Sequence, residues 1–329
     1  MIPVWIDDTA VGAPDLTGQD GSMYAVLKWA LPQLGWTLEH DDPANFRGAW
    51  RNNPTGSGYL LRLTDSALLH PADARRGMVE GFSAMADIDT GADRFPAQTP
   101  QYVVKSHTLD SAPRKWFILG TDRLFYFGSY NGAGGLNLGY RVYFAGDVAV
   151  YAPADPCPFV LGGFPDSGSS GSSGTSVFGD IGHGGNNTTT RDEMFALDFS
   201  SADPGAPARL VSSVAAEEAF GSTNAAGIRG VYPGVIGGGL NTSRIELFAF
   251  VAARWARCGA LPGVLEPMHD LTQSGVHPFE DLQQIPGIAN GLGLTTARYI
   301  SGSLAFGFSN STSSQFSLLL DTASDWDLW

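Results

Sequence analysis

The stretch KWFILGTDRLFYFG, residues 115–128, decides the fold class that the sequence predicts. Two runs of aromatic and aliphatic residues flank a Gly-Thr-Asp segment that begins at Gly120. Gly and Asp tolerate the backbone angles that reverse a chain, so this pattern predicts a β-hairpin.

Similar short runs of residues, either continuously apolar or alternating between apolar and polar, recur on both sides of this hairpin. They include YLLRLTD from residue 59, QYVVK from 101, YRVYFAG from 140, MFALDF from 194 and IELFAFVAARWA from 245. Gly, Asn and Ser separate many of them, as expected for strands joined by turns. The sequence therefore predicts a mainly β protein, sandwich-like or mixed α+β.

One amphipathic helix is expected near the N-terminus, from about Asp20 to Leu34. The apolar residues that recur there at intervals of three and four are Met23, Val26, Leu27, Ala30 and Leu31. Asp20 is placed to cap the first turn and Gly35 to end the last, while Pro32 limits the regularity of the final turn.

The composition changes at SGSSGSSGTS, residues 167–176, which offers no apolar side chain to bury. We interpret residues 166–176 as an exposed Ser/Gly loop. It separates an N-terminal part with the helix and several strands, residues 1–165, from a second β-rich part, residues 177–329. The second part is either a separate domain or a continuation of the same one.

Composition excludes several function classes. The chain of 329 residues carries 33 acidic and 19 basic residues, a formal net charge of −14, which disfavours nucleic acid and anionic lipid as partners. No apolar run approaches the ~20 residues of a membrane span. The N-terminus lacks the basic and apolar regions of a secretory signal, so folding in a cytosol is expected.

The two cysteines, Cys157 and Cys258, lack the spacing of a zinc site. We interpret them as buried apolar residues, with a disulfide between them as the alternative.

A candidate metal site lies in FSAMADIDTGADRFP, residues 82–96, where Asp87, Asp89 and Asp93 alternate. An EF-hand loop that began at Asp87 would need Gly at the sixth position and Glu at the twelfth. Gly91 is instead fifth, and Gln98 stands at the twelfth. These three aspartates are therefore only weak metal candidates.

A tight turn is the favoured interpretation of the same stretch. In this interpretation Asp87 and Asp89 accept backbone N–H bonds at a strand end, Gly91 supplies a positive φ, and Pro96 fixes the exit.

No catalytic constellation emerges from the sequence. FGDIGHGGNN, residues 178–187, places Asp180 and His183 in a glycine-rich loop but lacks the lysine of a phosphate-binding loop. The nearby Ser/Gly run does not have the spacing of a nucleophile elbow. We expect a protein that is not an enzyme, without catalytic residues or cofactor.

The C-terminal SDWDLW supplies interface candidates: Trp326, Leu328 and Trp329. Aromatic residues near a chain end either dock in the parent fold or lie at the centre of an interface, and the sequence leaves both open.

The order of several motifs resembles a family. GAPDLTGQDGSMYAVLKWAL, GYLLRLTDS, VEGFSAMADIDTGADRFP, KWFILGTDRLFYF, FGDI, LPGVLEPMHD and LLLDTASDW are together similar to segments of virion structural proteins of tailed, especially long-tailed Mu-like, bacteriophages. The similarity runs through most of the chain. In that family the aspartate run from Asp87 marks a tight turn between strands.

The resemblance implies a non-enzymatic component of a phage particle that is assembled in the host bacterial cytoplasm and found in the virion. We expect a minor capsid or decoration protein whose partners are other virion proteins and copies of itself. The alternative is a tail or baseplate protein, or a tail-tip module that binds a host carbohydrate receptor. In that module Trp116, Tyr126 and Tyr130 would stack on sugars, whereas core burial of these aromatics is the simpler expectation.

Overall fold

The computed structural model describes residues 1–69, 74–94, 101–106, 108–130, 140–150, 159–162, 164–165, 194–196, 208–212, 242–251, 254–267, 282–289, 293–303 and 315–328. Strands account for 50% and helical turns for 11% of this part of the chain, and the sheets are antiparallel. The prediction of a mainly β protein with a single N-terminal helix is confirmed for this part of the chain. In the same part, no helix has the length and apolarity needed to cross a membrane.

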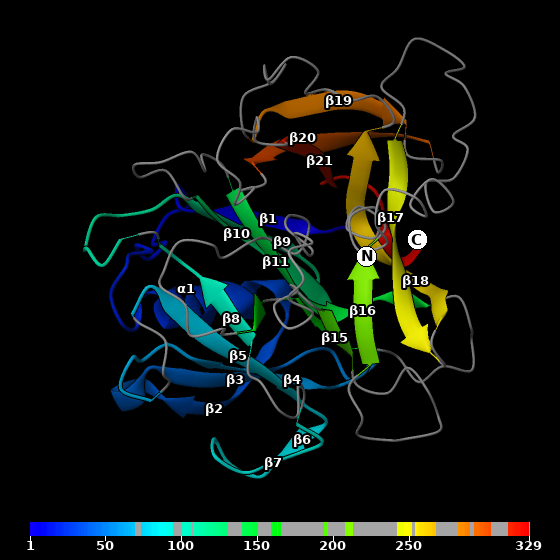
Figure 1. Ribbon diagram of the computed structural model, residues 1–329. Coiled ribbons are helices and arrows are strands. Elements are labelled where there is room, and N and C mark those ends of the chain that lie inside the picture. The colour runs from blue at the N-terminus through cyan, green and yellow to red at the C-terminus, as the bar shows by residue number, and fades with distance from the viewer. Residues whose placement is uncertain are drawn as a thin grey trace, which may run out of the picture.

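The larger sheet has 13 strands and receives strands from both predicted parts of the chain (Figure 1). Twelve of its strands follow the order β1-β9-β10-β11-β13-β15-β16-β17-β18-β21-β20-β19, and β12 pairs with β18. Their bounds are β1 Val4–Asp7, β9 Trp116–Gly120, β10 Leu124–Tyr130, β11 Tyr140–Asp147, β12 Ala149–Val150, β13 Phe159–Gly162, β15 Met194–Ala196, β16 Ala208–Ser212, β17 Thr242–Val251, β18 Arg254–Pro267, β19 Gln284–Ala289, β20 Leu294–Ser303 and β21 Gln315–Asp321. The Ser/Gly loop at 166–176 lies outside the described residues.

The hairpin predicted from residues 115–128 is present as β9 and β10. Phe125 lies opposite Gly120 and Ser129 opposite Trp116 in an antiparallel register. The Thr121 N–H donates to the Leu124 carbonyl across the turn, at 2.8 Å. A Cβ on Gly120 would lie 2.5 Å from that same carbonyl oxygen, so the close approach of the two strands requires glycine.

A second sheet has six strands in the order β14-β8-β5-β4-β3-β2. Their bounds are β2 Thr37–Asp42, β3 Arg47–Arg51, β4 Leu60–Thr64, β5 Arg76–Phe82, β8 Gln101–Val104 and β14 Phe164–Pro165. A small hairpin of β6, Ala84–Met85, and β7, Gly91–Ala92, follows β5 and lies at one end of the molecule (Figure 1).

The N-terminal helix matches the predicted segment closely. Helix α1 spans Ser22–Ala30 and continues as a 3₁₀ turn, Leu31–Leu34, which ends at Gly35 with φ 94°. The expectation that Asp20 caps the first turn is wrong, because its carboxylate accepts the Ala67 N–H instead, at 3.0 Å. The N-cap residue of α1 is Gly21, which makes no side-chain capping hydrogen bond.

The core forms where α1 lies between the two sheets (Figure 1). The apolar face of α1 contributes Met23, Val26, Leu27 and Ala30, all buried. Strands of the second sheet contribute Leu61, Leu63, Val79 and Val103, and β9–β11 contribute many aromatic and aliphatic side chains. A nine-residue helix is marginal alone in water, so this two-sided packing is what stabilises it.

Contacts between distant strands close the larger sheet over itself. The Tyr126 hydroxyl on β10 donates to the Pro262 carbonyl on β18, at 2.6 Å. The Arg298 guanidinium on β20 lies 4.4 Å from the ring centre of Trp5 on β1. Strand β12, which precedes the Ser/Gly loop in sequence, pairs with β18, which follows it. The two predicted β-rich parts therefore share one sheet.

Candidate functional site

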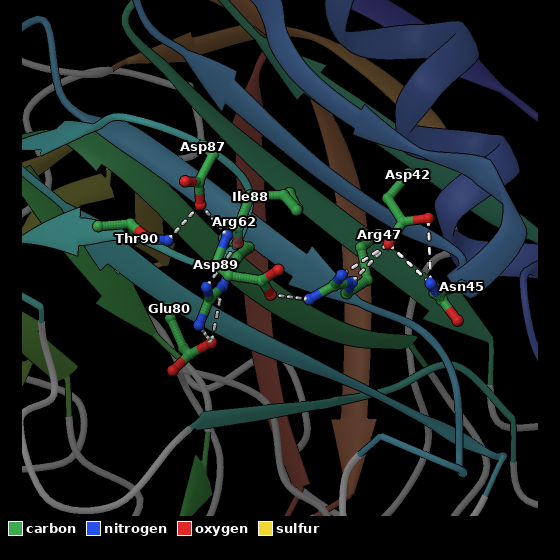
Figure 2. Close-up of polar contacts among 9 residues, drawn as sticks. All are labelled: Asp42, Asn45, Arg47, Arg62, Glu80, Asp87, Ile88, Asp89 and Thr90. Carbon is green, nitrogen blue, oxygen red and sulfur yellow. Dashed lines mark hydrogen bonds and ion pairs between the residues drawn. The ribbon is translucent and has the colours of Figure 1, made fainter.

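Asp87 and Asp89 lie in the turn of the β6–β7 hairpin, against the second sheet (Figure 2), and Asp93 directly follows β7. One Asp87 carboxylate oxygen accepts the N–H groups of Asp89 and Thr90, at 2.8 and 2.7 Å. Hydrogen bonds from the Asp89 backbone and from Thr90 lower the pKa of Asp87. Asp87 thus has the turn-forming contacts that the sequence predicts.

Asp89 and Asp93 differ from the expected turn. The Asp89 carboxylate pairs with the Arg47 guanidinium, and Asp93 accepts a hydrogen bond from the Ser83 hydroxyl. The positive φ belongs to Asp93, at 51°, and not to Gly91. Gly91 is needed for a different reason, because a Cβ there would lie 2.2 Å from the Phe82 ring. Pro96 lies outside the described residues.

The three aspartates therefore have three separate sets of partners. Figure 2 shows Asp87 directed to its own turn and Asp89 directed to Arg47. Across the described ranges, no three His, Cys, Asp or Glu residues gather as metal ligands would. The arrangement explains how the hairpin is held and gives no geometric support to a calcium loop.

Arg47 is the first of two arginines that hold this hairpin. Its Nε and Nη2 donate to Asp42 at 3.0 and 2.6 Å, and its Nη1 reaches Asp89. The Asn45 amide also donates to Asp42, at 2.9 Å. Hydrogen bonds from Asn45 and Arg47 lower the pKa of Asp42. The pair with Asp42 orients the Arg47 guanidinium toward the turn (Figure 2).

Arg62 is the second arginine. Its Nε and Nη2 donate to one oxygen of Glu80 at 3.0 and 2.5 Å, and its Nη1 donates to the Ile88 carbonyl at 2.8 Å. The Glu80 side chain is only 1% exposed and also pairs with Arg94, at 2.6 Å. The guanidinium of Arg62 stacks over Phe82, 4.8 Å from the ring centre. A buried carboxylate thus fixes an arginine that holds the hairpin backbone.

The interface candidate Trp326 is buried within its own chain. Its indole packs edge-on against Tyr126, with ring centres 6.0 Å apart. Its backbone N–H donates to the Met1 carbonyl at 2.9 Å, and its Nε1–H to the Asp321 carbonyl at 3.3 Å. Leu328 ends the 3₁₀ turn Trp326–Leu328, and Trp329 lies outside the described residues. Of the two roles open for Trp326, docking in the parent fold is the one that these contacts support.

The aromatics considered for sugar stacking lie mainly in the core. Trp116 and Tyr126 are fully buried, and Tyr130 is half-buried. The Trp116 indole donates to the Pro14 carbonyl at 3.0 Å. Core burial is thus confirmed for Trp116 and Tyr126, which offer no face to a sugar.

Other candidates from the sequence lie where the structure gives no side-chain detail. Asp180, His183 and Cys157 lie outside the described residues, and Cys258 lies in β18. The expectations for these four residues stay predictions from the sequence.

Sequence reasoning missed an ion pair between Asp65 and Lys105, both with 0% side-chain exposure. Lys105 Nζ pairs with Asp65 Oδ1, while Asp65 Oδ2 accepts the N–H groups of Met23 and Tyr24, at 2.8 and 3.1 Å. Asp65 is thus the residue that caps α1. Burial raises the pKa of Asp65 to about 6, against the lowering effect of Lys105. The signal in the sequence was a charged residue at the end of two apolar runs, Asp65 after YLLRLT and Lys105 after QYVV.

A buried polar cluster was also missed, at the end of β11. The Asp147 carboxylate accepts hydrogen bonds from the Ser57 hydroxyl at 2.5 Å and from the Asn52 amide at 2.9 Å. Burial raises the pKa of Asp147, and the hydrogen bonds from Ser57 and Asn52 oppose this rise. The cluster joins the loop after β3 to the larger sheet.

In comparisons with known proteins, no family model matches the chain, and no curated protein matches it.

Proposed function

We propose that this protein is a non-enzymatic structural component of a tailed bacteriophage particle, a minor capsid or decoration protein that packs on the virion surface. The observation that carries the proposal is the conformation of residues 79–94, which belong to one of the segments that resemble the virion family. Asp87 shapes its turn, and Arg47 and Arg62 hold the turn against the second sheet. This is the tight turn between strands that the resemblance implies.

The use of buried charge supports a structural role. Asp65 joins a strand end to the helix N-terminus, and Glu80 orients Arg62 toward the hairpin. Buried charges are costly to desolvate and are retained where they fix a specific arrangement or perform chemistry. Because the partners of both groups are backbone groups or cations of neighbouring elements, a role in fixing the fold accounts for them.

The charge of the chain favours protein partners within a particle. A net charge of −14 repels packaged nucleic acid, so contacts with other virion proteins and with copies of this chain account better for its place in a particle. The tail-tip receptor alternative loses its main support, since Trp116 and Tyr126 are buried.

Site-specific labelling of particles tests the proposed location. Val11 is 99% exposed, so Val11→Cys presents a thiol for a gold-maleimide label, and the unsubstituted chain is the matched control for Cys157 and Cys258. Electron microscopy should show label spread evenly over the capsid. Label confined to the tail or its tip would overturn the decoration role and favour the tail alternative.

A further inference from the structure

Two strand ends of the second sheet meet at the N-terminus of α1. Asp65 directly follows β4 and Lys105 directly follows β8, and both strands pair antiparallel with β5. Strands β4 and β8 therefore run in the same direction, and their C-terminal ends lie at the same end of the sheet. Lys105 Nζ pairs there with Asp65 Oδ1, and neither side chain has exposed surface.

The two oxygens of the Asp65 carboxylate have different surroundings. Oδ1 faces the Lys105 amine, whereas Oδ2 accepts the N–H groups of Met23 and Tyr24 at 2.8 and 3.1 Å. Lys105 Nζ also donates to the Gln19 carbonyl, at 2.5 Å. Two convergent backbone N–H groups at a helix N-terminus are the arrangement that stabilises an oxyanion during acyl transfer.

We propose that Lys105 and Asp65 join in an intramolecular amide bond, so that the folded chain carries a covalent cross-link between the ends of β8 and β4. Lys105 Nζ first transfers a proton to Asp65 Oδ1. The neutral amine then attacks Cγ, and the developing negative charge on Oδ2 is stabilised by the Met23 and Tyr24 N–H groups. The Cγ–Oδ1 bond then breaks. Oδ1 takes a second proton from the attached nitrogen and leaves as water. The ammonium and carboxylate together hold every atom of the amide and the water, so no further reactant is needed.

Burial favours this condensation over the ion pair. Two desolvated charges are replaced by one neutral amide, which removes the cost of keeping an ammonium and a carboxylate out of water. Fixing the amine beside the carboxyl converts a bimolecular step into an intramolecular one. The raised pKa of Asp65 is consistent with a carboxyl that exchanges a proton with its neighbour. Hydrolysis would require water to enter a site with no exposed side-chain surface.

The chemistry distinguishes this pair from the other buried carboxylate pair described above. Glu80 faces the guanidinium groups of Arg62 and Arg94, and a guanidinium is a poor nucleophile. Lys105 offers a primary amine, which is a nucleophile once it has given up a proton. Glu80 is therefore an internal control that should remain unmodified.

A cross-link here would close the chain between two residues that are 40 positions apart. Like a disulfide across a loop, it would restrict the unfolded chain and so stabilise the folded one. It would tie α1, β4 and β8 at one point, since Asp65 also caps the helix.

Intact mass spectrometry of the purified, folded full-length chain, denatured just before injection, tests the proposal. We expect a mass lower than the sequence mass by one water molecule, and a branched proteolytic peptide that joins Lys105 to Asp65. The full sequence mass would overturn the proposal. So would a water loss that maps to Asp20–Gly21, because an Asp-Gly bond can lose water by forming a succinimide.

Lys105→Arg provides the matched variant, because it keeps the positive charge and removes the amine. Its mass should equal the full mass calculated from its sequence, and the branched peptide should be absent. The test holds even if this variant fails to fold, because the mass of the unsubstituted chain is measured independently. A water loss that persists in Lys105→Arg would contradict the assignment.

Discussion

Replacing Trp326 by alanine should destabilise the fold strongly. The indole is 5% exposed, lies edge-on to Tyr126, and donates to the Asp321 carbonyl. Truncation of a buried Trp to Ala removes apolar contacts and leaves a cavity, at a cost of about 3–5 kcal/mol. A residue at an interface between chains would instead change little in the isolated protein.

The contact between Trp326 and Gly263 allows a sharper version of this prediction. Gly263 has φ 75°, and a Cβ there would lie 2.0 Å from the indole. Gly263→Ala should therefore cost about 1–2 kcal/mol for the left-handed backbone and about 1–3 kcal/mol for overpacking. In the Trp326→Ala background only the backbone cost remains, so the double variant should be more stable than additivity predicts by about 1–3 kcal/mol.

Urea unfolding followed by far-UV circular dichroism measures all four members of this cycle without relying on tryptophan fluorescence. A loss below about 1 kcal/mol for Trp326→Ala would refute the assignment of this indole to the core, given the cost expected for a buried Trp. Additivity within about 0.5 kcal/mol would refute the contact with Gly263.

Three further predictions concern the helix, the aspartate turn and pH. Gly21→Ala should lower the unfolding free energy by about 1–2 kcal/mol or more, because Gly21 has φ 81° and a Cβ would lie 2.5 Å from the Phe46 ring; urea unfolding measures the change. Asp89→Ala should cost at most about 1 kcal/mol, since Asp89 is exposed and Arg47 keeps its pair with Asp42. Calcium should leave the melting temperature of the unsubstituted chain unchanged, and a rise with calcium would count against the turn assignment. Burial raises the pKa of Asp147 above 3.8, so its stabilising contribution is present below that value and is lost as the pH rises through the folded-state pKa. The stability of Asp147→Asn relative to the unsubstituted chain should therefore increase above about pH 4 in urea unfolding, and the opposite slope would contradict the assignment.

Local features of the fold could be predicted from the sequence. The Gly-Thr-Asp segment and its flanking runs specify the β9–β10 hairpin within a few residues. The apolar spacing of α1 and the left-handed Gly35 are likewise local, which is why the helix and its end were predicted correctly.

Features that depend on distant residues could not be predicted. Asp65, which caps α1, is 42 positions from Met23 in sequence, and its partner Lys105 is 40 positions further on. In the aspartate run, the sequence could not show that the Phe82 ring would occupy the space beside Gly91. Asp93 then takes the left-handed conformation in its place. Pairing of Asp89 with Arg47 likewise depends on where β3 lies in the sheet.

We propose that this chain is a structural part of a phage particle. Quantitative mass spectrometry of purified, intact phage particles is the decisive test of this proposal. We expect peptides of the chain in many copies per particle, in a fixed ratio to the major capsid protein. Particles that are intact and infectious but lack the chain would contradict it.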